Sequence, residues 1–255
     1  MKVYALDEGS YSVGVDKKFI PFDPKTDDKK DRKGSLFINV QPFLVELEDE
    51  LIVIDSGLGF AHDGKMVIHE NIRKLGYEPE DVTLVLMSHL HQDHASGMVD
   101  TETGSLSFPN AEYVIQRTEW EEAYSNTKSS YKTEIFDTLQ RSGHIHFVEG
   151  DGQLNSAISY ELSGAHSPFH QVFHIVSEGQ HLFYGGDEWP EPEQALRRFA
   201  AKYDYDGHKA MELREQYATQ AAEENWTCLF YHADENAIAK IAKKEDSFRI
   251  LPITN

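Results

Sequence analysis

Six consecutive residues of the chain, HLHQDH, hold three histidines and one aspartate. Neutral imidazoles gain nothing from one another, and once one is protonated it repels any other that carries a charge. A divalent metal ion reverses this preference, because it binds several deprotonated nitrogen and oxygen ligands at once. His89 and His91 are separated by one residue, and Asp93 stands beside His94. On a loop that leaves a strand, this spacing can direct two donors to one metal ion and two to another.

Further candidate donors follow predicted strands or tight turns later in the chain. His166 and His170 lie in LSGAHSPFH, Asp187 lies in FYGGDEWP, and His232 lies in LFYHADENA. In each case an apolar run ends in a polar donor. Strand ends are where open α/β architectures place their active sites, so we expect these donors to meet the first four. The single cysteine, Cys228, excludes a cysteine-rich zinc site.

The elements that must position these donors alternate between apolar strands and amphipathic helices. Residues 36–47 and 51–55 form two β-rich runs around a short polar turn, which predicts a hairpin. Residues 65–76 have apolar side chains at nearly helical spacing and end at a glycine, which predicts a helix. Residues 82–87, VTLVLM, are typical of a strand that is buried on both faces. The histidine-rich stretch follows this strand directly.

The rest of the chain continues with clusters of strands and helices. Strands are predicted at 112–116, 144–148, 157–162, 171–177, 181–186, 226–231 and 247–251. Helices are predicted at 117–124, 131–143, 192–203, 207–225 and 236–244. Two packed sheets with helices outside are the simplest arrangement of such elements, an α/β (α+β) fold. We expect one domain over residues 1–255, with the charged, proline-containing residues 17–33 as a loop insertion.

Four segments resemble, in order, the motifs of the metallo-β-lactamase superfamily. HLHQDH matches the H-x-H-x-D-H signature, and SGAHSPFHQ resembles the motif with the next histidine ligand. YGGDEW resembles the segment with the bridging aspartate, and FYHADENA resembles the segment with the last histidine. The resemblance extends over roughly residues 35–250. It implies an αββα four-layer sandwich, the metallo-β-lactamase fold, with two metal ions in a cleft at the sheet edges.

The resemblance also implies a ligand set for two Zn²⁺ ions, with Mn²⁺ or Fe²⁺ as alternatives. The seven implied ligands are His89, His91 and His166 for one ion, Asp93, His94 and His232 for the other, and Asp187 as the bridge. Asp55, at the end of the run LIVID, matches an aspartate that orients the ligands without binding metal. His170 stands where the family often has a second histidine that is not a ligand.

This ligand set predicts a hydrolase in which a metal-bridging hydroxide attacks an ester carbonyl, because zinc lowers the pKa of bound water to about 7. Asp93 would pass a proton to the leaving group. A lactone is the first candidate substrate, because the spacings of 21 residues from His166 to Asp187 and 45 from Asp187 to His232 resemble those of quorum-quenching N-acyl-homoserine lactonases. A glyoxalase II-like thioesterase, another ester or phosphoester hydrolase, and a non-catalytic metal-binding protein are the alternatives.

One position departs from the lactonase pattern. Those enzymes have a tyrosine three residues after the bridging aspartate, directed at the substrate carbonyl, and this chain has Pro190 there. Tyr203, Tyr205 and Tyr231 are the candidates to replace that tyrosine.

Charge and hydropathy limit the partners and the location of the protein. The formal net charge of −20 disfavours nucleic acid, so we expect a small-molecule ester or lactone as the substrate. The apolar runs are much shorter than the roughly 20 residues of a membrane span, and no signal peptide pattern opens the chain, so we expect no membrane and a cytoplasmic protein.

We expect residues 17–33 to pack at the cleft mouth or at the contact of a homodimer. Residues 19–22 and Phe169 are candidates for an acyl-binding wall.

Overall fold

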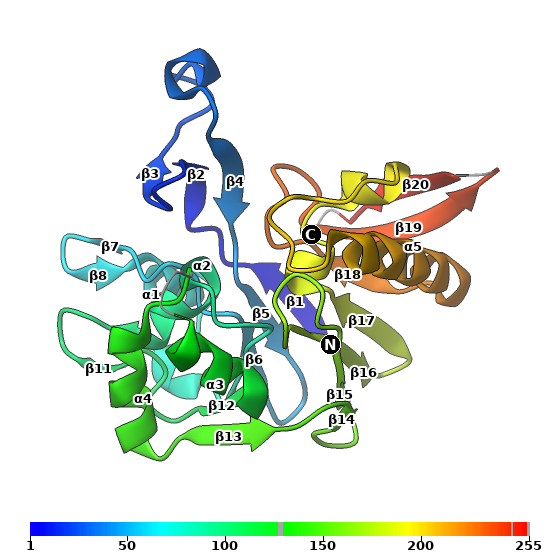
Figure 1. The fold of residues 1–255 in the computed structure, drawn as a ribbon. Helices are drawn as coiled ribbons and strands as arrows, with labels where there is room; N and C mark the ends of the chain where they lie inside the picture. The colour runs from blue at the N-terminus through cyan, green and yellow to red at the C-terminus, as the bar shows by residue number, and fades with distance from the viewer. Residues whose placement is uncertain (127–129, 246, 254–255) are drawn as a thin grey trace.

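The computed structural model describes residues 1–126, 130–245 and 247–253, and two mixed β-sheets form its centre (Figure 1). The first sheet contains, in spatial order, β1 (Lys2–Ala5), β5 (Phe43–Glu46), β6 (Leu51–Ile54), β9 (Leu84–Leu86), β12 (Glu112–Gln116) and β13 (Ile145–Val148). The second contains β14 (Gly152–Gln153), β15 (Ile158–Leu162), β16 (Gln171–Ser177), β17 (Gln180–Tyr184), β18 (Thr227–Leu229), β19 (Ile238–Lys244) and β20 (Ser247–Pro252). Strands β6, β9, β12 and β13 run parallel, as do β17 and β18.

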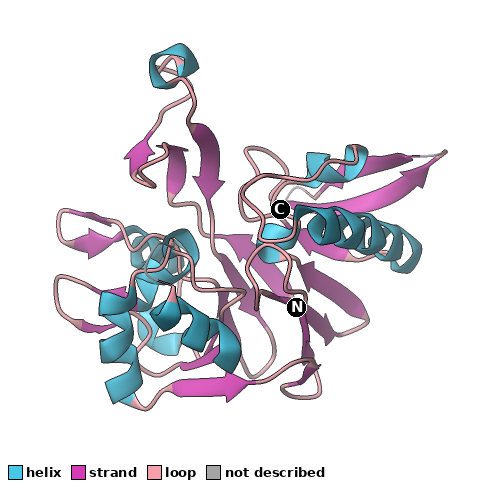
Figure 2. Cartoon of the chain, in the orientation of Figure 1, coloured by secondary structure: helices cyan, strands magenta, loops and turns pink. Residues whose placement is uncertain are grey.

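Helices lie outside the two sheets (Figure 2). The α-helices are α1 (Val67–Lys74), α2 (Gln92–Ala95), α3 (Arg117–Ser125), α4 (Phe136–Ser142) and α5 (Gly207–Glu224). The 3-10 helices are η1 (Lys29–Arg32), η2 (Pro79–Asp81), η3 (Ser96–Met98), η4 (Thr133–Ile135), η5 (Gly186–Glu188) and η6 (Pro192–Leu196). Within the described ranges, none of these helices combines the length and the apolar character that crossing a membrane requires.

Three apolar clusters hold the layers together. Between the sheets, Phe43 and Ile54 of the first pack with Tyr184 of the second. On the outer face of the first sheet, apolar side chains from α1, α3 and α4 pack against β9 and β12. On the outer face of the second sheet, Tyr217 and Ala221 of α5 pack against β17 and β18. The predicted αββα order of layers is confirmed.

A three-stranded sheet, which we call the arm, extends away from these layers (Figure 1). It contains β3 (Phe19–Pro21), β2 (Gly9–Val13) and β4 (Leu36–Val40), with η1 at its tip. The charged residues 17–33, predicted as a loop, therefore include a short strand and a helical turn. Two small hairpins complete the fold: β7 (Ala61–His62) with β8 (Lys65–Met66), and β10 (Val99–Asp100) with β11 (Ser105–Leu106).

Residues 36–47 form two strands in different sheets rather than one. β4 belongs to the arm and β5 to the first sheet, with Gln41 and Pro42 between them. Proline cannot donate to a strand ladder, so β-pairing is interrupted there. The side chain of Gln41 instead donates a hydrogen bond to the Ala233 carbonyl, next to His232. Because of this break, residues 36–47 contribute one strand to the arm and another to the first sheet.

The helix predicted at 192–203 is wrong beyond its first turn. Only η6 forms, and no helix follows from 197 to 206. Backbone groups of this segment bond elsewhere, because the Phe199 carbonyl accepts from the Arg214 guanidinium and the Tyr205 amide donates to the His166 carbonyl. Tertiary contacts therefore replace the helical ladder and fix residues 197–206, which we call the wall segment.

The helix predicted at 236–244 is also wrong, since Ile238–Lys244 form β19. Alanine and lysine favour helices, and Ile238 and Ile241 have helical spacing, but propensity is a weak constraint. β19 lies between β18 and β20 and pairs with both. Ile238 faces the cluster between the sheets, whereas Ala239 and Ile241 face α5. Burial on both faces explains why the alternation of a strand was hidden.

Candidate metal centre

The candidate donors lie on loops at one edge of the two sheets. The histidine-rich loop follows β9 and leads into α2. The loop between β15 and β16 carries His166 and His170, η5 after β17 carries Asp187, and the loop after β18 carries His232. Because the ends of these strands meet at the same edge, residues more than 130 positions apart in the sequence come together.

Three imidazoles form the first group of donors. His89 Nε2 lies 3.0 Å from His91 Nδ1, and His166 Nε2 lies 3.2 Å from the same His91 nitrogen. The ring nitrogens of His89 and His166 thus both lie within hydrogen-bond distance of His91 Nδ1. A neutral imidazole has only one N–H group, so these rings cannot all donate a hydrogen bond at this point. Nitrogen donors in this arrangement suit a divalent transition metal.

Asp93, His94 and His232 form the second group. Asp93 Oδ2 lies 3.9 Å from His94 Nε2 and 3.6 Å from His232 Nε2. Asp187 lies between the two groups. Its Oδ1 is 3.1 Å from His94 Nε2 and 3.2 Å from His232 Nε2, whereas its Oδ2 is 3.2 Å from His166 Nε2. One carboxylate therefore presents one oxygen to each group of donors.

The unsatisfied atoms of the centre test whether it fits metal ions. Among the described residues, His94 Nε2 and Asp187 Oδ1 are both buried and neither has a hydrogen-bond partner of acceptable geometry. Unpaired buried polar atoms are costly, so their alignment here requires an explanation. The ligand atoms of His89, His91 and His166 all lie within 4.8 Å of one another, and so do those of Asp93, His94 and His232. Both groups therefore fit a bound divalent cation.

The charges of the side chains favour the same interpretation. Burial, together with the neighbouring imidazoles, holds the pKa of His89 and of His91 well below the ordinary value. Burial opposes ionisation of Asp187, but His232, His94 and His166 together lower its pKa well below the usual range. Metal binding requires neutral imidazole and ionised carboxylate. Asp187 and the neighbouring carboxylates raise the pKa of His94, of His166 (to about 9) and of His232. Without a cation, protons on these rings therefore balance the buried carboxylates, and a bound divalent cation would replace those protons.

Asp55 lies behind His94 and is completely buried. Its carboxylate accepts hydrogen bonds at 2.7 Å from the Ser88 amide, the Ser88 hydroxyl and His94 Nδ1, and one at 2.5 Å from the Tyr184 hydroxyl. Its φ of 52° is left-handed, which is uncommon for a residue with a side chain. Such strain persists where the surroundings fix a residue, and here it directs His94 Nε2 towards the centre.

His170 contacts the backbone of Asp187 instead of joining either donor group. The hydroxyl of Ser163 lies 2.8 Å from His170 Nδ1, and the Asp187 amide donates to His170 Nε2 at 3.1 Å. Its imidazole thereby fixes the turn that presents the Asp187 carboxylate.

Other supporting residues had no signal in the sequence. His166 Nδ1 lies 3.0 Å from the buried carboxylate of Asp204, which is 3.7 Å from the guanidinium of Arg214 on α5. Asp204 directly follows the helix that was predicted at 192–203, and it reaches His166 only because residues 197–206 form the wall segment instead. His232 Nδ1 donates to the carbonyl of Asn39 on the arm at 2.6 Å, a backbone contact that no motif marks.

A cavity of about 450 Å³ opens directly over the donors. Side chains from the arm, the histidine-rich loop and the wall segment surround it. The lining residues are Val13, Lys17, Phe19, Leu36, Ile38, His91, Gln92, Asp93, Ser130, His166, Asp187, Pro190, Glu191, Gln194, Lys202, Tyr203 and His232. The arm therefore forms one wall of the mouth of the cleft. Of the predicted acyl-binding residues Phe19 lines this cavity, whereas Phe22 packs on Phe37 within the arm.

The three candidate tyrosines occupy different places. Tyr203 lines the cavity, with its ring centroid 6.2 Å from that of His166. Tyr231 is fully buried, stacks on His94 at 3.9 Å, and donates to the Asp93 carbonyl. Tyr205 is 71% exposed and is not among the lining residues. Only Tyr203 of the three can meet a ligand in the cavity.

Comparison with known proteins gives one family over most of the chain. Residues 37–232 match the family model described as the metallo-beta-lactamase superfamily. The N-acyl homoserine lactonase of Bacillus thuringiensis is 27% identical over 158 residues, which cover 53% of this chain and 58% of that protein. The N-acyl homoserine lactonase AttM of Agrobacterium fabrum is 31% identical over 171 residues, covering 53% and 60%. The chain thus spans little more than half the length of these curated relatives.

Solved structures share the fold over nearly the whole chain. A probable metal-dependent hydrolase from Staphylococcus aureus has a TM-score of 0.80 at 21% identity, covering 100% of this chain and 97% of that chain. AidC, a dizinc quorum-quenching lactonase in complex with a product, has a TM-score of 0.76 at 22% identity, covering 99% and 94%. The hydrolase AbOPH has a TM-score of 0.76 at 21% identity, with the same coverage. At these identities the likeness establishes the fold.

Proposed function

The chain belongs to the metallo-beta-lactamase superfamily, and we propose that it is a metal-dependent hydrolase of an ester bond, with an acyl-substituted lactone as the first candidate substrate. One observation carries this proposal. Both donor groups open into one cavity of about 450 Å³, a size typical of small-molecule sites, and one wall of that cavity is apolar. Donors for metal ions and a surface for an acyl chain are therefore adjacent.

We propose that His89, His91 and His166 hold one divalent ion, that Asp93, His94 and His232 hold a second, and that Asp187 contacts both. Bound there, the ions would supply a water-derived nucleophile at neutral pH and polarise the substrate carbonyl. The residues behind the ligands keep the donors in place before substrate arrives. Asp55 and Asp204 each accept a hydrogen bond from the outer nitrogen of a histidine, which fixes the tautomer and the orientation of that ring.

Asp93 is placed to handle the proton that ester hydrolysis must deliver to the leaving oxygen. Its carboxylate lines the cavity, and its backbone carbonyl is held by the buried hydroxyl of Tyr231. The backbone of Asp93 is thus fixed from behind, while Oδ2 lies beside His94 and His232 at the base of the cavity. We propose that Asp93 takes a proton from the nucleophile and passes it to the leaving group.

Tyr203 is our candidate for the hydrogen bond to the substrate's reacting oxygen. Burial raises the pKa of Tyr203 to about 12, so its hydroxyl keeps its proton at neutral pH and can donate it. The ring of Tyr203 lies beside His166, a member of the first donor group, with the two ring centroids 6.2 Å apart. A donor in this position would stabilise negative charge that develops on the oxygen.

The apolar wall supports a substrate with an acyl chain. Val13, Phe19, Leu36 and Ile38 of the arm face the cavity, and Pro190 joins them. Burying even a few methylene groups there contributes about 0.8 kcal/mol for each. The curated relatives at 27–31% identity are named N-acyl homoserine lactonases, which fits this wall and puts a lactone first.

A comparison of two substrates tests the proposal. Protein of verified zinc content would be given N-decanoyl-homoserine lactone and, separately, S-lactoylglutathione, and initial rates would be measured. We expect faster opening of the lactone, and loss of that activity on chelation. Faster cleavage of the thioester would contradict the lactone assignment, and no metal-dependent turnover of either substrate or of simple aryl esters would contradict an ester hydrolase.

A further inference from the structure

The cavity over the metal centre has two chemically different sides. Leu36 and Ile38 of the arm lie next to Asn39, whose carbonyl binds His232, so the apolar wall adjoins the second donor group. Glu191 belongs to the same side, because it lines a smaller neighbouring pocket together with Ile38 and His232. Lys17 and Lys202 also line the cavity. Lys17, in the turn between β2 and β3, lies beside the histidine-rich loop, and Lys202 adjoins Tyr203, whose ring lies beside His166. A ligand that fills the cavity therefore meets ammonium groups as well as the apolar wall.

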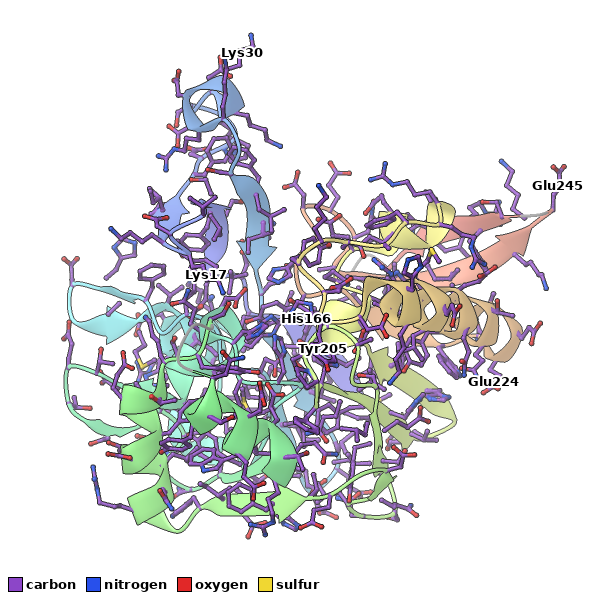
Figure 3. The ribbon with its side chains drawn as sticks, in the orientation of Figure 1. Lys17, Lys30, His166, Tyr205, Glu224 and Glu245 are labelled. Carbon is purple, nitrogen blue, oxygen red and sulfur yellow. The ribbon has the colours of Figure 1, made fainter. Side chains whose placement is uncertain are left out.

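Lys17 is held in place by the loop that carries the ligands. Gln92, which lies between His91 and Asp93, donates from its side chain to the Lys17 carbonyl at 2.8 Å. The Lys17 ammonium donates to the Ser130 hydroxyl at 3.0 Å. The backbone amide of Gln92 donates to the Ser130 carbonyl at 2.9 Å. Figure 3 shows Lys17 at the base of the arm, in the region where His166 also lies.

The backbone of Lys17 is in a strained conformation. Its φ is 57°, in the left-handed region that non-glycine residues rarely adopt. Strain of this kind persists where surrounding contacts impose it, and it gathers at ligand sites. The turn between β2 and β3 imposes it here, since the Lys17 amide donates to the Gly14 carbonyl at 3.0 Å. The turn and the Gln92 contact together fix the backbone of Lys17 beside the histidine-rich loop.

Lys202 stands on the wall segment, which is clamped to the His166 side of the centre. Two residues later Asp204 binds His166 and pairs with Arg214, and the Asp206 amide donates to the Ala165 carbonyl at 2.8 Å. Within the described parts of the chain, Lys202 forms no ion pair. Its ammonium is therefore available to a ligand, while its backbone is fixed relative to a metal-centre histidine.

Basic side chains are scarce in this protein, so two lysines, Lys17 and Lys202, beside one cavity are notable. The chain has 24 lysines and arginines against 44 acidic residues, and its formal net charge is −20. Such a surface repels anionic ligands in general, so positive charge at the mouth of the cavity, in addition to that of bound metal ions, would help an anion to approach the centre. The two lysines supply that charge at the mouth of the cavity.

We propose that the substrate is an ester with an anionic group, of which a carboxylate is the simplest case, and that Lys17 and Lys202 bind this group on the side of His91 and His166. The apolar part of the substrate lies on the apolar side chains of the arm. The ester bond is thereby oriented between its apolar part and its anionic group. This inference rests on the proposed hydrolase function, and it departs from the uncharged acyl lactone named there as the first candidate, because it requires an ester that also carries an anion.

Two esters of equal length test the inference by turnover. 4-Nitrophenyl hexanoate ends in a methyl group, and the 4-nitrophenyl monoester of adipate ends in a carboxylate at the corresponding position. We expect the zinc-loaded protein to have the higher kcat/KM for the adipate ester. The double variant K17M/K202M should lose roughly tenfold in kcat/KM for the adipate ester, as two solvent-exposed ion pairs would give, and change by less than about twofold for the hexanoate ester.

A matched control separates local charge from total charge. Lys244 is exposed on β19, away from the residues that line the cavity, and K244M removes the same charge. This variant should leave the ratio of the two kcat/KM values unchanged. A wild-type ratio near one, or an adipate preference that survives in K17M/K202M, would overturn the inference.

Binding of unreactive analogues keeps the inference testable without turnover. The anilides of hexanoic acid and of adipic acid differ in the same way as the esters, and calorimetry on the zinc-loaded protein gives their affinities. We expect tighter binding of the adipate anilide, lost in K17M/K202M and weakened by salt. Such binding without hydrolysis of either ester would contradict the hydrolase and support the anion site. Hydrolysis of the esters, together with equal affinities for the two anilides, would support the hydrolase and contradict the anion site.

Discussion

The metal centre and the arm differ in how their side chains are held. At the centre, His94, His166 and His232 each have a partner behind the ring, in Asp55, Asp204 and the Asn39 carbonyl. On the arm, Ile20 and Leu36 are about half exposed, and η1 buries no residue. The difference shows where each property of the proposed enzyme resides. A rigid, buried network fixes the chemistry, and an exposed sheet that can vary at low cost in stability shapes the substrate site.

The largest effect should follow from removing the carboxylate that joins the two donor groups. Asp187→Asn keeps the shape of the side chain but removes the charge that faces three histidines. We expect zinc content to fall below two ions per chain, and activity to fall more than about 100-fold, since even residues behind ligands are worth 10–100-fold. Metal analysis and ester kinetics measure both. Asp49→Asn, in an exposed turn, is the control, and full zinc content in Asp187→Asn would refute the bridging role.

A pH effect on stability should mark the junction of the arm with the rest of the protein. Burial raises the pKa of Glu8 to about 8, against an ordinary value of 4.5. The folded state therefore keeps a proton that the unfolded chain has lost, so stability falls as pH rises from about 4.5 to about 8, by up to about 1.4 kcal/mol per pH unit. Below this range the stabilisation is complete, and above it none is left.

Glu8→Gln isolates this effect, because glutamine does not titrate. The free energy of unfolding of the variant, minus that of the wild type, should rise with pH over this range and stay constant above it. Urea denaturation at a series of pH values measures the difference. A difference that is independent of pH would show that Glu8 is ionised in the folded protein.

A smaller effect is expected behind the first donor group. Asp204→Asn weakens the hydrogen bond to His166 and leaves Arg214 without its carboxylate, so zinc affinity should fall about 10- to 100-fold. Competition with a chromophoric chelator measures the affinity. Asp206→Asn is the matched control, because asparagine still caps α5 and contacts no donor. Equal affinities in the two variants would mean that the wall segment does not position the centre.

Tyr203→Phe should lower kcat about tenfold with zinc content unchanged, because it removes one neutral hydrogen bond to the reacting oxygen, worth up to about 1.5 kcal/mol. Tyr205→Phe, on the same segment but facing solvent, should have no effect. If kcat is the same in the Tyr203 variant and the wild type, another group must contact that oxygen.

The smallest effect should come from the apolar wall. Phe19→Ala should raise KM about fivefold for a long acyl chain and hardly at all for a short one, because only the long chain buries methylene groups there. Ile20→Ala alters the next residue of β3, which is not among the residues that line the cavity, and should leave both KM values unchanged. Equal changes for both chain lengths would place the acyl chain elsewhere.

The sequence revealed the donors because their chemistry is local: HLHQDH is contiguous, and each later donor ends an apolar run. Their supports were hidden because they depend on tertiary contacts. Asp204 reaches His166 only because Arg214 and the loop at 164–166 bond the wall segment and prevent a helix. β19 was mistaken for a helix because burial on both faces removed its alternation. The choice among three tyrosines likewise required knowing which ring faces the cavity.

A stepwise zinc titration of the metal-free protein, with lactone hydrolysis followed at each addition, tests the central claim most directly. Seven donors arranged as two groups around Asp187 predict that activity rises with zinc and reaches its plateau at two ions per chain. A plateau at one ion, or hydrolysis that does not depend on added metal, would contradict a centre that needs both groups of donors.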